Sequence, residues 1–356
     1  MTVPDDDIAA QVVRWQAGHG RNHLPWQNTQ DPYRVWLSEV MLQQTQVATV
    51  LDYYARFLAR FPDVRALAEA PQDDVLALWS GLGYYSRARN LHACAKQVME
   101  RHGGQFPRTV EELASLPGIG RSTAGAIASF CFGVRAPILD ANVRRVLTRV
   151  LGFHADLAVA KNERLLWAEA EALLPTQDLG HTMPRYTQGL MDLGASLCSP
   201  RKPACIVCPL HARCVARREG NPEDYPVRTR KLTRSAQAWW LLLQRDAAGR
   251  LWLGRRPQTG IWAGLYCPPV FDGREALVAA AAESAAPSVA LQDLPASLHV
   301  LTHRDLHLHP VLVACGDEHA RVVRESDEGG WFTASQWTAV GLPAPIRKLL
   351  DALPPV

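Results

Sequence analysis

The chain has 356 residues, enough for two domains that each enclose a hydrophobic core. A net charge of +3 does not by itself indicate a nucleic-acid-binding protein, and no apolar run is long enough to span a membrane. The Met1–Asp7 segment is acidic and lacks the apolar stretch of a secretory signal, so we expect a cytoplasmic protein in a reducing compartment.

The first part of the chain, residues 1–216, is predicted to be all helical. Asp31 followed by Pro32 is typical of a helix start, and helical spacing continues from there to Phe61. Another helix is expected to follow Pro71 and to end at Gly81. Alanine-rich segments predict further helices at 122–133, 142–151 and 161–173.

A change of composition predicts a second domain. The segment 217–236 is polar, charged and contains proline, which favours a linker. Beyond it, over 237–356, short strand-like runs alternate with turns, and two helices are expected at 274–286 and 344–353. The strand-like runs are 238–244, 251–254, 298–301 and 311–315. The sequence therefore predicts a small α+β domain after the helical one.

Four cysteines lie within seventeen residues, at Cys198, Cys205, Cys208 and Cys214. Four thiolates so close together predict a metal site, which could hold zinc or an iron–sulfur cluster. The stretch from Cys198 to Arg234 also carries nine basic side chains against three acidic ones, including the basic residue Arg213. This local excess of positive charge favours contact with phosphate, whereas a solvated linker is the simpler alternative.

A turn near the middle of the helical part could bind an anion. Gly118 and Gly120 precede a helix that is expected to begin near Ser122. Glycine permits turn conformations and close approach, and the free N–H groups of a helix start attract a phosphate. Alone, this pattern indicates only a turn. Followed by the sequence from Arg121 to Ala126, it resembles a helix–hairpin–helix motif.

Two carboxylates are candidates for acid–base chemistry. Glu39 has the apolar neighbours Val35 and Leu42 on the same expected helix face, so partial burial should raise its pKa. Asp140 precedes a predicted helix and could merely cap it, which is compatible with an ionised carboxylate. A protonated and an ionised carboxyl together suit cleavage of a glycosidic bond.

The chain resembles the MutY family of adenine DNA glycosylases, members of the helix–hairpin–helix, iron–sulfur DNA glycosylase superfamily, over nearly its full length. The block from Pro32 to Val50 is the most specific carrier of the resemblance, together with 81–91, the hairpin, 138–143 and the cysteine loop 198–214. The resemblance implies a monofunctional enzyme of base excision repair. It would bind double-stranded DNA and remove adenine mispaired with 8-oxoguanine or guanine.

The same resemblance assigns roles to individual residues. It implies that Glu39 protonates adenine and then activates water, and that Asp140 stabilises the cationic sugar or a covalent intermediate. Asn142 and Ser122 would support these two carboxyls. The residues that would line the adenine pocket are Trp26, Gln27 and Asp192. Those that would wedge into the duplex are Gln44, Leu82 and Tyr84. It also implies a 4Fe–4S cluster on the four cysteines. We expect a monomer that associates with the bacterial nucleoid and not with a membrane.

The C-terminal part resembles a Nudix-like module, best in the stretch from Gly260 to Pro269. A Nudix hydrolase needs a glutamate-rich metal helix, and the segment that starts at Arg274 has too few acids, so we expect recognition without hydrolysis. Thr302 and His303 fall where the family has a loop that binds 8-oxoguanine. The implied fold is an all-α helix–hairpin–helix glycosylase domain with its 4Fe–4S loop, followed by an α+β Nudix-like domain.

Two other functions remain open from the sequence. A glycosylase with lyase activity would need a lysine nucleophile just after the hairpin, where this chain has Ser122. A DNA-binding iron–sulfur redox sensor would need neither Glu39 nor Asp140.

Overall fold

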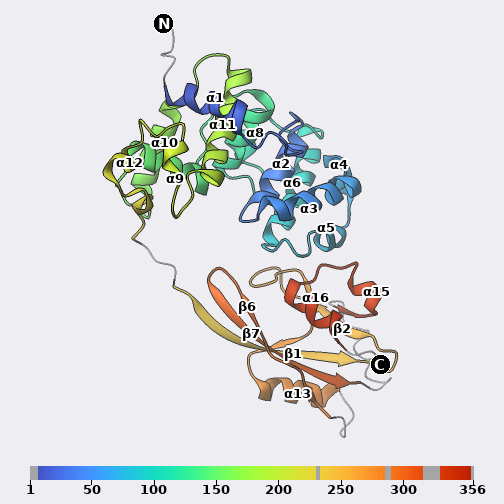
Figure 1. Ribbon diagram of the computed structural model, residues 1–356. Coiled ribbons are helices and arrows are strands. Elements are labelled where there is room, and N and C mark those ends of the chain that lie inside the picture. Colours follow the sequence, from blue (N-terminus) through green and yellow to red (C-terminus); the bar gives the residue numbers. More distant parts are fainter. Residues whose placement is uncertain (1–6, 230–232, 285–289, 316–328, 354–356) are drawn as a thin grey trace. The chain divides into compact units, whose positions relative to one another are not determined.

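The structure, a computed structural model, describes residues 7–229, 233–284, 290–315 and 329–353 (Figure 1). The chain forms two compact units. The first contains residues 1–54, 61–68 and 93–231, and the second contains residues 55–60, 69–92 and 232–356. Residues 230–232, within the segment predicted as a linker, lie outside the described residues.

Helices make up the regular structure of the described chain up to residue 229. In chain order they are α1 (Ile8–His19), α2 (Pro32–Leu42), α3 (Val47–Arg60), α4 (Val64–Glu69), α5 (Gln72–Leu78), α6 (Ser86–His102), α7 (Val110–Ala114), α8 (Arg121–Phe132), α9 (Ala141–Leu151), α10 (Ala160–Ala172), α11 (Leu179–Ser196) and α12 (Val215–Glu219). Two short 3-10 turns, Cys205–Val207 and Pro222–Asp224, flank α12. The all-helical prediction is confirmed.

The predicted helix start at Asp31 is confirmed, but the helical run that follows it is broken. The Asp31 side chain accepts a hydrogen bond of 2.9 Å from the Tyr33 N–H, and Pro32 occupies the first turn. The spacing predicted helix as far as Phe61, whereas α2 ends at Leu42 and Gln44 has a left-handed backbone with φ of 58°. One residue in this conformation ends a helix, because the i to i−4 hydrogen bonds cannot continue through it.

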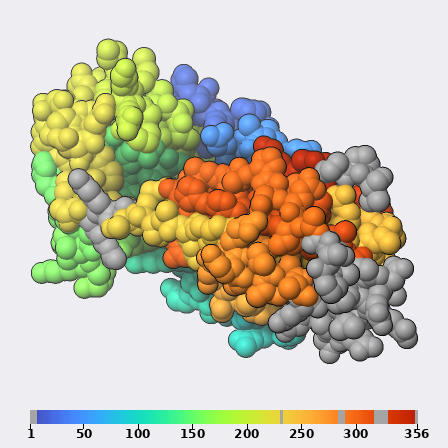
Figure 2. All heavy atoms as spheres, turned by 90° about the horizontal axis from the view of Figure 1, so that it is seen from below, coloured from blue at the N-terminus to red at the C-terminus, as the bar shows by residue number. Residues whose placement is uncertain are grey.

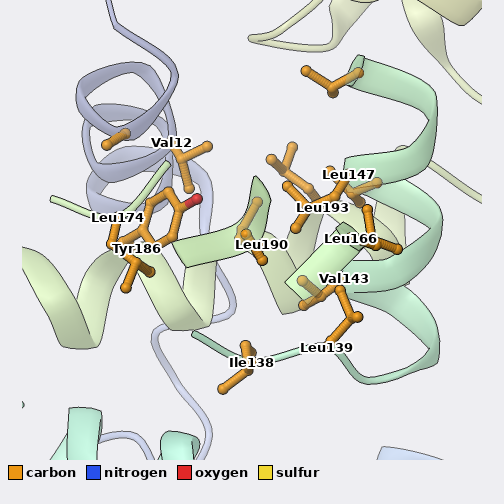
Figure 3. Close-up of a cluster of buried hydrophobic side chains, with 14 of the residues drawn as sticks. Val12, Ile138, Leu139, Val143, Leu147, Leu166, Leu174, Tyr186, Leu190 and Leu193 are labelled. Atoms are coloured by element: carbon orange, nitrogen blue, oxygen red, sulfur yellow. The ribbon is translucent and has the colours of Figure 1, made fainter. Parts of the chain in front are cut away.

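A hydrophobic core lies between α1, α9, α10 and α11 in the first unit. Figure 3 shows side chains from these helices and from the strand-like segment before α9 pointing toward one another. The labelled members are Val12, Ile138, Leu139, Val143, Leu147, Leu166, Leu174, Tyr186, Leu190 and Leu193. This core fixes the start of α9, where Asp140 lies, against α11.

The segment after α12 is held to the loop that follows α9. The Tyr225 hydroxyl donates to a Glu219 carboxylate oxygen at 2.5 Å and lies 3.0 Å from the His154 ring nitrogens. Further along, Thr229 donates to Asp156 through its hydroxyl and its backbone N–H. Residues up to 229 therefore belong structurally to the first unit.

The second unit is built on a mixed sheet. Its strands are β1 (Ser235–Arg245), β2 (Leu251–Arg255), β3 (Tyr266–Cys267), β4 (Val270–Phe271), β5 (Gln292–Asp293), β6 (Ser297–Val300), β7 (Arg304–Ala314) and β8 (Gly329–Phe332). The order is β3-β2-β1-β7-β5, with β4 on β1, β6 on β7 and β8 on β2. Every pairing is antiparallel except β1 with β7, which run parallel from Ser235 opposite Arg304 to Arg245 opposite Ala314.

Helices cover the sheet. Helix α13 (Arg274–Ser284) lies against β1 (Figure 1) and also contacts β4. Its Leu277 joins Leu242 and Val311 in a buried cluster. Two more helices, α15 (Ala334–Trp337) and α16 (Ala344–Asp351), complete the unit, and Figure 2 shows its orange and yellow atoms closely packed on one face. The predicted α+β fold is confirmed. In the described residues, no helix is both long and apolar enough to cross a membrane.

Candidate functional site

A cavity of about 630 Å³ opens in the first unit beside Glu39. Helix α2 supplies Val35, Ser38 and Glu39 to its wall, and the turn before α2 supplies Trp26 and Gln27. Glu39 lines this cavity, whereas Leu37, on the opposite face of α2, is fully buried in the protein. Glu39, Trp26 and Gln27, three of the residues predicted from the sequence, are thus brought together.

The Glu39 carboxyl is suited to hold a proton. Part of the side chain is accessible from the cavity, yet protein surrounds the rest. Burial and, after it, the negative charge of Asp140 raise the pKa of Glu39 to about 8. The carboxyl is therefore mostly neutral near pH 7 and can act as a general acid.

Asp140 is held at the start of α9 by its own backbone. Its Oδ1 accepts hydrogen bonds from the N–H groups of Asn142 at 2.6 Å and Val143 at 2.9 Å, as predicted for a helix cap. Burial raises the pKa of Asp140, while these two N–H groups and the cations of Arg145 and Arg144 act in the opposite direction. Because both N–H groups are fixed donors, Oδ1 is an acceptor, and these two hydrogen bonds favour the ionised form of the carboxyl.

Ser122 fixes the segment that carries Asp140. Its Oγ accepts a hydrogen bond of 3.0 Å from the Leu139 N–H, so the first turn of α8 is tied to the residue before Asp140. Helix α8 also approaches closely at Gly125, where a Cβ would lie 2.5 Å from the Pro137 carbonyl oxygen. The hairpin helix and Asp140 are therefore positioned together.

Asn142 belongs to a chain of hydrogen bonds that leads from the cap to the cysteine loop. Its Oδ1 accepts from Arg145 Nη2 at 2.8 Å, and the same nitrogen donates to the Gly194 carbonyl at 2.7 Å. Arg145 Nε donates to the Cys198 carbonyl at 2.7 Å. Gly194 permits this contact because a Cβ there would lie 2.6 Å from the Asn142 Cβ. The start of α9 is thereby coupled to the first cysteine.

Helix α11 and helix α1 supply polar wall residues that the sequence analysis missed. These are Gln16 on α1 and Arg185 and Gln188 on α11. Arg185 Nη1 donates to Gln16 Oε1 at 3.0 Å. A signal for α11 existed in the sequence, because Arg185, Gln188 and Asp192 follow one another at spacings of three and four residues, which places them on one face of a helix. No local signal indicated Gln16, whose role depends on how α1 packs on α11.

The remaining pocket residues differ in how they meet the cavity. Trp26 is buried and packs edge-on against Tyr54, with ring centroids 5.3 Å apart. The amide nitrogen and oxygen of Gln27 are both buried and make no hydrogen bond among the described residues, so a bound base could satisfy them. Asp192 is 1% exposed and lies behind the wall, where it binds Arg21 and Gln188.

One small apolar cavity near the start of α12 is lined by all four clustered cysteines, namely Cys198, Cys205, Cys208 and Cys214. Buried Arg149 reaches this cavity and donates to the Cys198 Sγ at 3.3 Å and to the Ser199 carbonyl at 2.7 Å. Such a cation stabilises thiolates. Among the described residues, no group of three or more His, Cys, Asp and Glu side chains is arranged to hold a metal ion.

The hairpin before α8 fits the predicted need for glycine at Gly118 but not at Gly120. Gly118 has a φ of 76°, which favours glycine, and Gly120 is the N-cap residue of α8. A Cβ at Gly120 would meet nothing within 4 Å, so space remains in front of the helix start. The Arg121 guanidinium stacks on α10, 4.0 Å from the centre of the Trp167 ring. Arg213, also predicted to face DNA, is exposed on the cysteine loop.

A second cavity, of about 750 Å³, lies in the second unit. Tyr84, Thr302 and His303 all line it, and the Tyr84 hydroxyl lies 2.9 Å from the Thr302 Oγ1. A hydrogen bond of 2.8 Å from the Leu301 N–H to the Arg304 carbonyl closes the turn that presents Thr302 and His303. The structure thus brings together a predicted wedge residue and the predicted 8-oxoguanine loop.

The other two predicted wedge residues differ in exposure. Leu82 is buried, with 6% of its surface exposed, whereas Gln44 is exposed. Gln44 and Tyr84 both have a left-handed backbone, with φ of 58° and 47°. Such a conformation is unfavourable for a residue with a side chain, and residues held in it cluster at active sites and ligand-binding segments.

Family models match both parts of the chain. Residues 37–171 match the HhH-GPD superfamily base excision DNA repair protein, and residues 238–352 match a NUDIX domain. An adenine DNA glycosylase of Buchnera aphidicola subsp. Acyrthosiphon pisum is 36% identical over 96% of this chain and 95% of its own length. The adenine DNA glycosylase of Homo sapiens is 43% identical over 60% of this chain and 40% of its own length.

Solved structures resemble the helical part. A thermostable thymine-DNA glycosylase has a TM-score of 0.52 and 28% identity, and it covers 59% of this chain and 95% of its own. Endonuclease III in a trapped covalent DNA intermediate has a TM-score of 0.50 and 21% identity over 62% of this chain and 99% of its own, which shows a shared fold.

Proposed function

Since the chain belongs to the adenine DNA glycosylase family, we propose that it hydrolyses the N-glycosidic bond of adenine paired with 8-oxoguanine or guanine in duplex DNA. It is a DNA N-glycosylase of base excision repair. The observation that carries the proposal is the cavity lined by Glu39, whose pKa is raised to about 8 by burial and by the charge of Asp140, a residue outside the cavity wall. A flipped adenine would occupy this cavity, since the bond cannot be reached inside the stack.

Glu39 would serve first as acid and then as base. The neutral carboxyl gives its proton to the departing adenine as the bond between the base and C1′ breaks. The carboxylate that remains then accepts a proton from the water that attacks C1′, which restores the neutral acid. A raised pKa suits this cycle, because the acid must be protonated before each turnover near pH 7.

Asp140 would stabilise the positive charge that develops on the sugar. Its carboxylate is fixed by the Asn142 and Val143 N–H groups, so no reorganisation is needed when the charge appears. The hydrogen bond from Leu139 to Ser122 supports the same position. The arrangement assigns proton transfer and charge stabilisation to two different carboxyls.

The second cavity supports recognition of the base opposite adenine. Thr302 and His303 provide a hydroxyl and an imidazole that can bind the O8 or the protonated N7 of 8-oxoguanine. Gln44, Leu82 and Tyr84 would fill the gap that the flipped adenine leaves. The left-handed backbone at Gln44 and Tyr84 supports such a role, since it holds a side chain out of the regular helix path.

A monofunctional reaction is supported by the residues after the hairpin. A lyase forms a Schiff base with an amine nucleophile. Helix α8 contains no lysine, and Ser122 is occupied as an acceptor for the Leu139 N–H. Water is therefore the expected nucleophile.

The four cysteines would hold a 4Fe–4S cluster. All four line one small apolar cavity, which gathers their thiols at one place in the first unit. The six-residue and five-residue arms outside the central Cys205–Cys208 pair are unlike the two short knuckles of a zinc finger, which favours the cluster over zinc. When bound, the cluster would join four points of the loop and order its basic surface, with Arg149 offsetting the thiolate charge.

A single-turnover assay tests the activity. A duplex with adenine opposite 8-oxoguanine should lose adenine with the wild-type protein and give strand breaks only after alkali. Glu39→Gln should bind the duplex but excise at least about 10²-fold more slowly. Excision by this variant within tenfold of wild type would refute the assignment of Glu39. Trapping of a covalent adduct by borohydride would instead indicate a lyase.

The cluster is tested by composition. The purified protein should be yellow-brown and contain about four iron and four sulfide per chain. A colourless protein with one zinc per chain would refute the iron–sulfur assignment and leave the glycosylase proposal intact.

A further inference from the structure

Arg87 is a buried cation next to the wedge loop, residues 81–85, which precedes α6. Only 7% of its surface is exposed, although it lies in the first turn of α6, where the helix dipole disfavours a positive charge. Burial lowers the pKa of Arg87 to about 10, so the guanidinium has lost much of its hydration but stays charged near pH 7. A buried cation at this end of a helix needs compensating contacts, and the wedge loop supplies several of them.

The Arg87 guanidinium binds the backbone of the wedge loop at two consecutive carbonyls. Its Nη2 donates to the Leu82 carbonyl at 3.1 Å and to the Gly83 carbonyl at 3.2 Å. The Gly83 carbonyl also accepts a hydrogen bond of 3.1 Å from Nε1 of Trp79, which is fully buried. Two donors on one carbonyl therefore orient the peptide group that leads into Tyr84.

The same guanidinium supports the side chain of Tyr84. Its Cζ lies 5.4 Å from the centre of the Tyr84 ring and 5.3 Å from the centre of the Trp79 ring, within the range of cation–π contacts. Tyr84 has a φ of 47° and Gly83 a φ of 71°, so the backbone enters a region that disfavours a residue with a side chain. Such a conformation persists only where surrounding contacts determine it, and Arg87 and Trp79 make contacts of this kind.

We propose that Arg87, aided by Trp79, is a positioning residue that holds the wedge loop in the shape in which it enters the duplex. The inference rests on the proposed wedging role of Leu82 and Tyr84. A loop that is ordered before DNA binds loses little conformational entropy on binding, so more of the binding free energy remains for opening the base stack. Arginine suits this role better than lysine, because its planar group can stack on a ring while it donates to two carbonyls.

Arg87→Lys keeps the charge but removes the planar group. We expect single-turnover excision of adenine opposite 8-oxoguanine to fall about tenfold or more, because the wedge is displaced. Adenine opposite an abasic site has no pairing partner and is opened more easily, so its excision should fall by less than about threefold. The ratio of the two rates, measured on one preparation, is independent of the fraction of protein that is folded.

The control for this substitution is Arg101→Lys. Arg101 is an exposed arginine in the last turn of the same helix, α6, and the change should keep the wild-type ratio of the two rates.

The fluorescence of 2-aminopurine reports the wedge directly. The analogue replaces the base next to 8-oxoguanine on the same strand, and its emission changes when an inserted side chain separates it from its neighbour. Glu39→Gln is the background for this measurement, so that adenine stays in the duplex. Adding Arg87→Lys should reduce the change in emission at saturating protein, whereas adding Arg101→Lys should leave it as it is.

A double-mutant cycle tests whether Arg87 acts through the wedge loop. Tyr84→Ala should itself lower the ratio of the two excision rates. Adding Arg87→Lys to Tyr84→Ala should then lower the ratio much less than Arg87→Lys does alone, because the side chain that it positions is already absent.

Two results would overturn the inference. One is a wild-type ratio in Arg87→Lys, including an equal loss of both rates, which would show a purely structural role. The other is a full effect of Arg87→Lys in the Tyr84→Ala background, which would show that Arg87 acts elsewhere.

A second variant decides the matter if Arg87→Lys does not fold. Trp79→Phe removes one donor to the Gly83 carbonyl and keeps an aromatic ring, so it should lower the ratio of the two rates in the same direction. A wild-type ratio in Trp79→Phe would then overturn the inference. A wild-type protein that excises adenine from neither duplex would instead refute the proposed function.

Discussion

Glu39 on α2 and Asp140 at the start of α9 are electrostatically coupled: burial, and after it the charge of Asp140, raises the pKa of the Glu39 carboxyl to about 8. Asp140 in turn is bound to two backbone N–H groups that favour its ionised form, whereas both influences on Glu39 favour the neutral form. Of the two carboxyls, Asp140 is therefore the one that ionises first, and Glu39 is the one that keeps its proton.

The first prediction is a loss of activity at high pH. Because Glu39 must be neutral to donate a proton, single-turnover excision should fall as the pH rises through about 8, by about tenfold per pH unit above it. The measurement is the excision rate from about pH 5 to about pH 9.5, with duplex affinity recorded at each pH. A rate that stays constant over this range would contradict a general-acid role for Glu39.

The second prediction concerns stability. The folded pKa of Glu39 is about 8, against about 4.3 for an unfolded chain, so between these values the folded state holds an extra proton. Wild-type stability should therefore decrease as the pH rises through this window, and Glu39→Gln should remove that decrease.

Relative to wild type, Glu39→Gln should raise the free energy of unfolding by nearly zero at about pH 4 and by about 1–3 kcal/mol at about pH 8. This gain is smaller than the whole pKa shift would give, because solvent reaches the cavity. Denaturant unfolding at several pH values measures it. Glu171→Gln, at an exposed site on α10, should show no such pH dependence. A Glu39→Gln gain that does not change with pH would argue against a raised pKa.

The third prediction separates charge from capping at Asp140. Asparagine is also a good N-cap residue, so Asp140→Asn should change the free energy of unfolding by less than about 1 kcal/mol. Excision should nevertheless fall by at least about 10²-fold, because the carboxylate charge is lost. Asp63→Asn, which alters another capping aspartate, is the matched control and should remain active. Near-normal excision by Asp140→Asn would exclude the electrostatic role.

The fourth prediction tests the contact between α11 and the start of α9. Gly194→Ala places a Cβ 2.6 Å from the Asn142 Cβ and 3.0 Å from its backbone, so α9 must shift. We expect a stability loss of about 1–3 kcal/mol and a fall in excision of about tenfold or more. Gly18→Ala on α1, where a Cβ meets nothing within 4 Å, should stay active. Unchanged excision in Gly194→Ala would show that the Asp140 position tolerates this shift.

The fifth prediction concerns the opposite base. Thr302→Ala with His303→Ala should spare excision of adenine opposite guanine at saturating enzyme but reduce the preference for 8-oxoguanine. Each lost hydrogen bond should lower the discrimination by about 0.5–1.5 kcal/mol. Thr338→Ala, an exposed threonine in the same unit, is the control. Equal losses on both duplexes would show that the loop supports only the fold.

Local features of this chain were determined by the sequence alone. The caps at Asp31 and Asp140, the ranges of α8, α9 and α10, and the clustered cysteines depend on neighbours within a few residues, so the sequence pattern alone predicts them. The break at Gln44 was not predicted, because apolar spacing continues across it and only the backbone conformation interrupts the helix.

The tertiary structure determined which residues that are distant in sequence come into contact. Asp192 binds Arg21 across 171 positions of the chain, and Tyr84 meets Thr302 across 218. Such pairs depend on which helices and strands pack together. An apolar periodicity predicts that a helix has a buried face, but it does not specify which element packs on that face. The pKa of Glu39 was predicted in direction from its apolar neighbours, but its value is set by burial in a cavity that helices distant in sequence build.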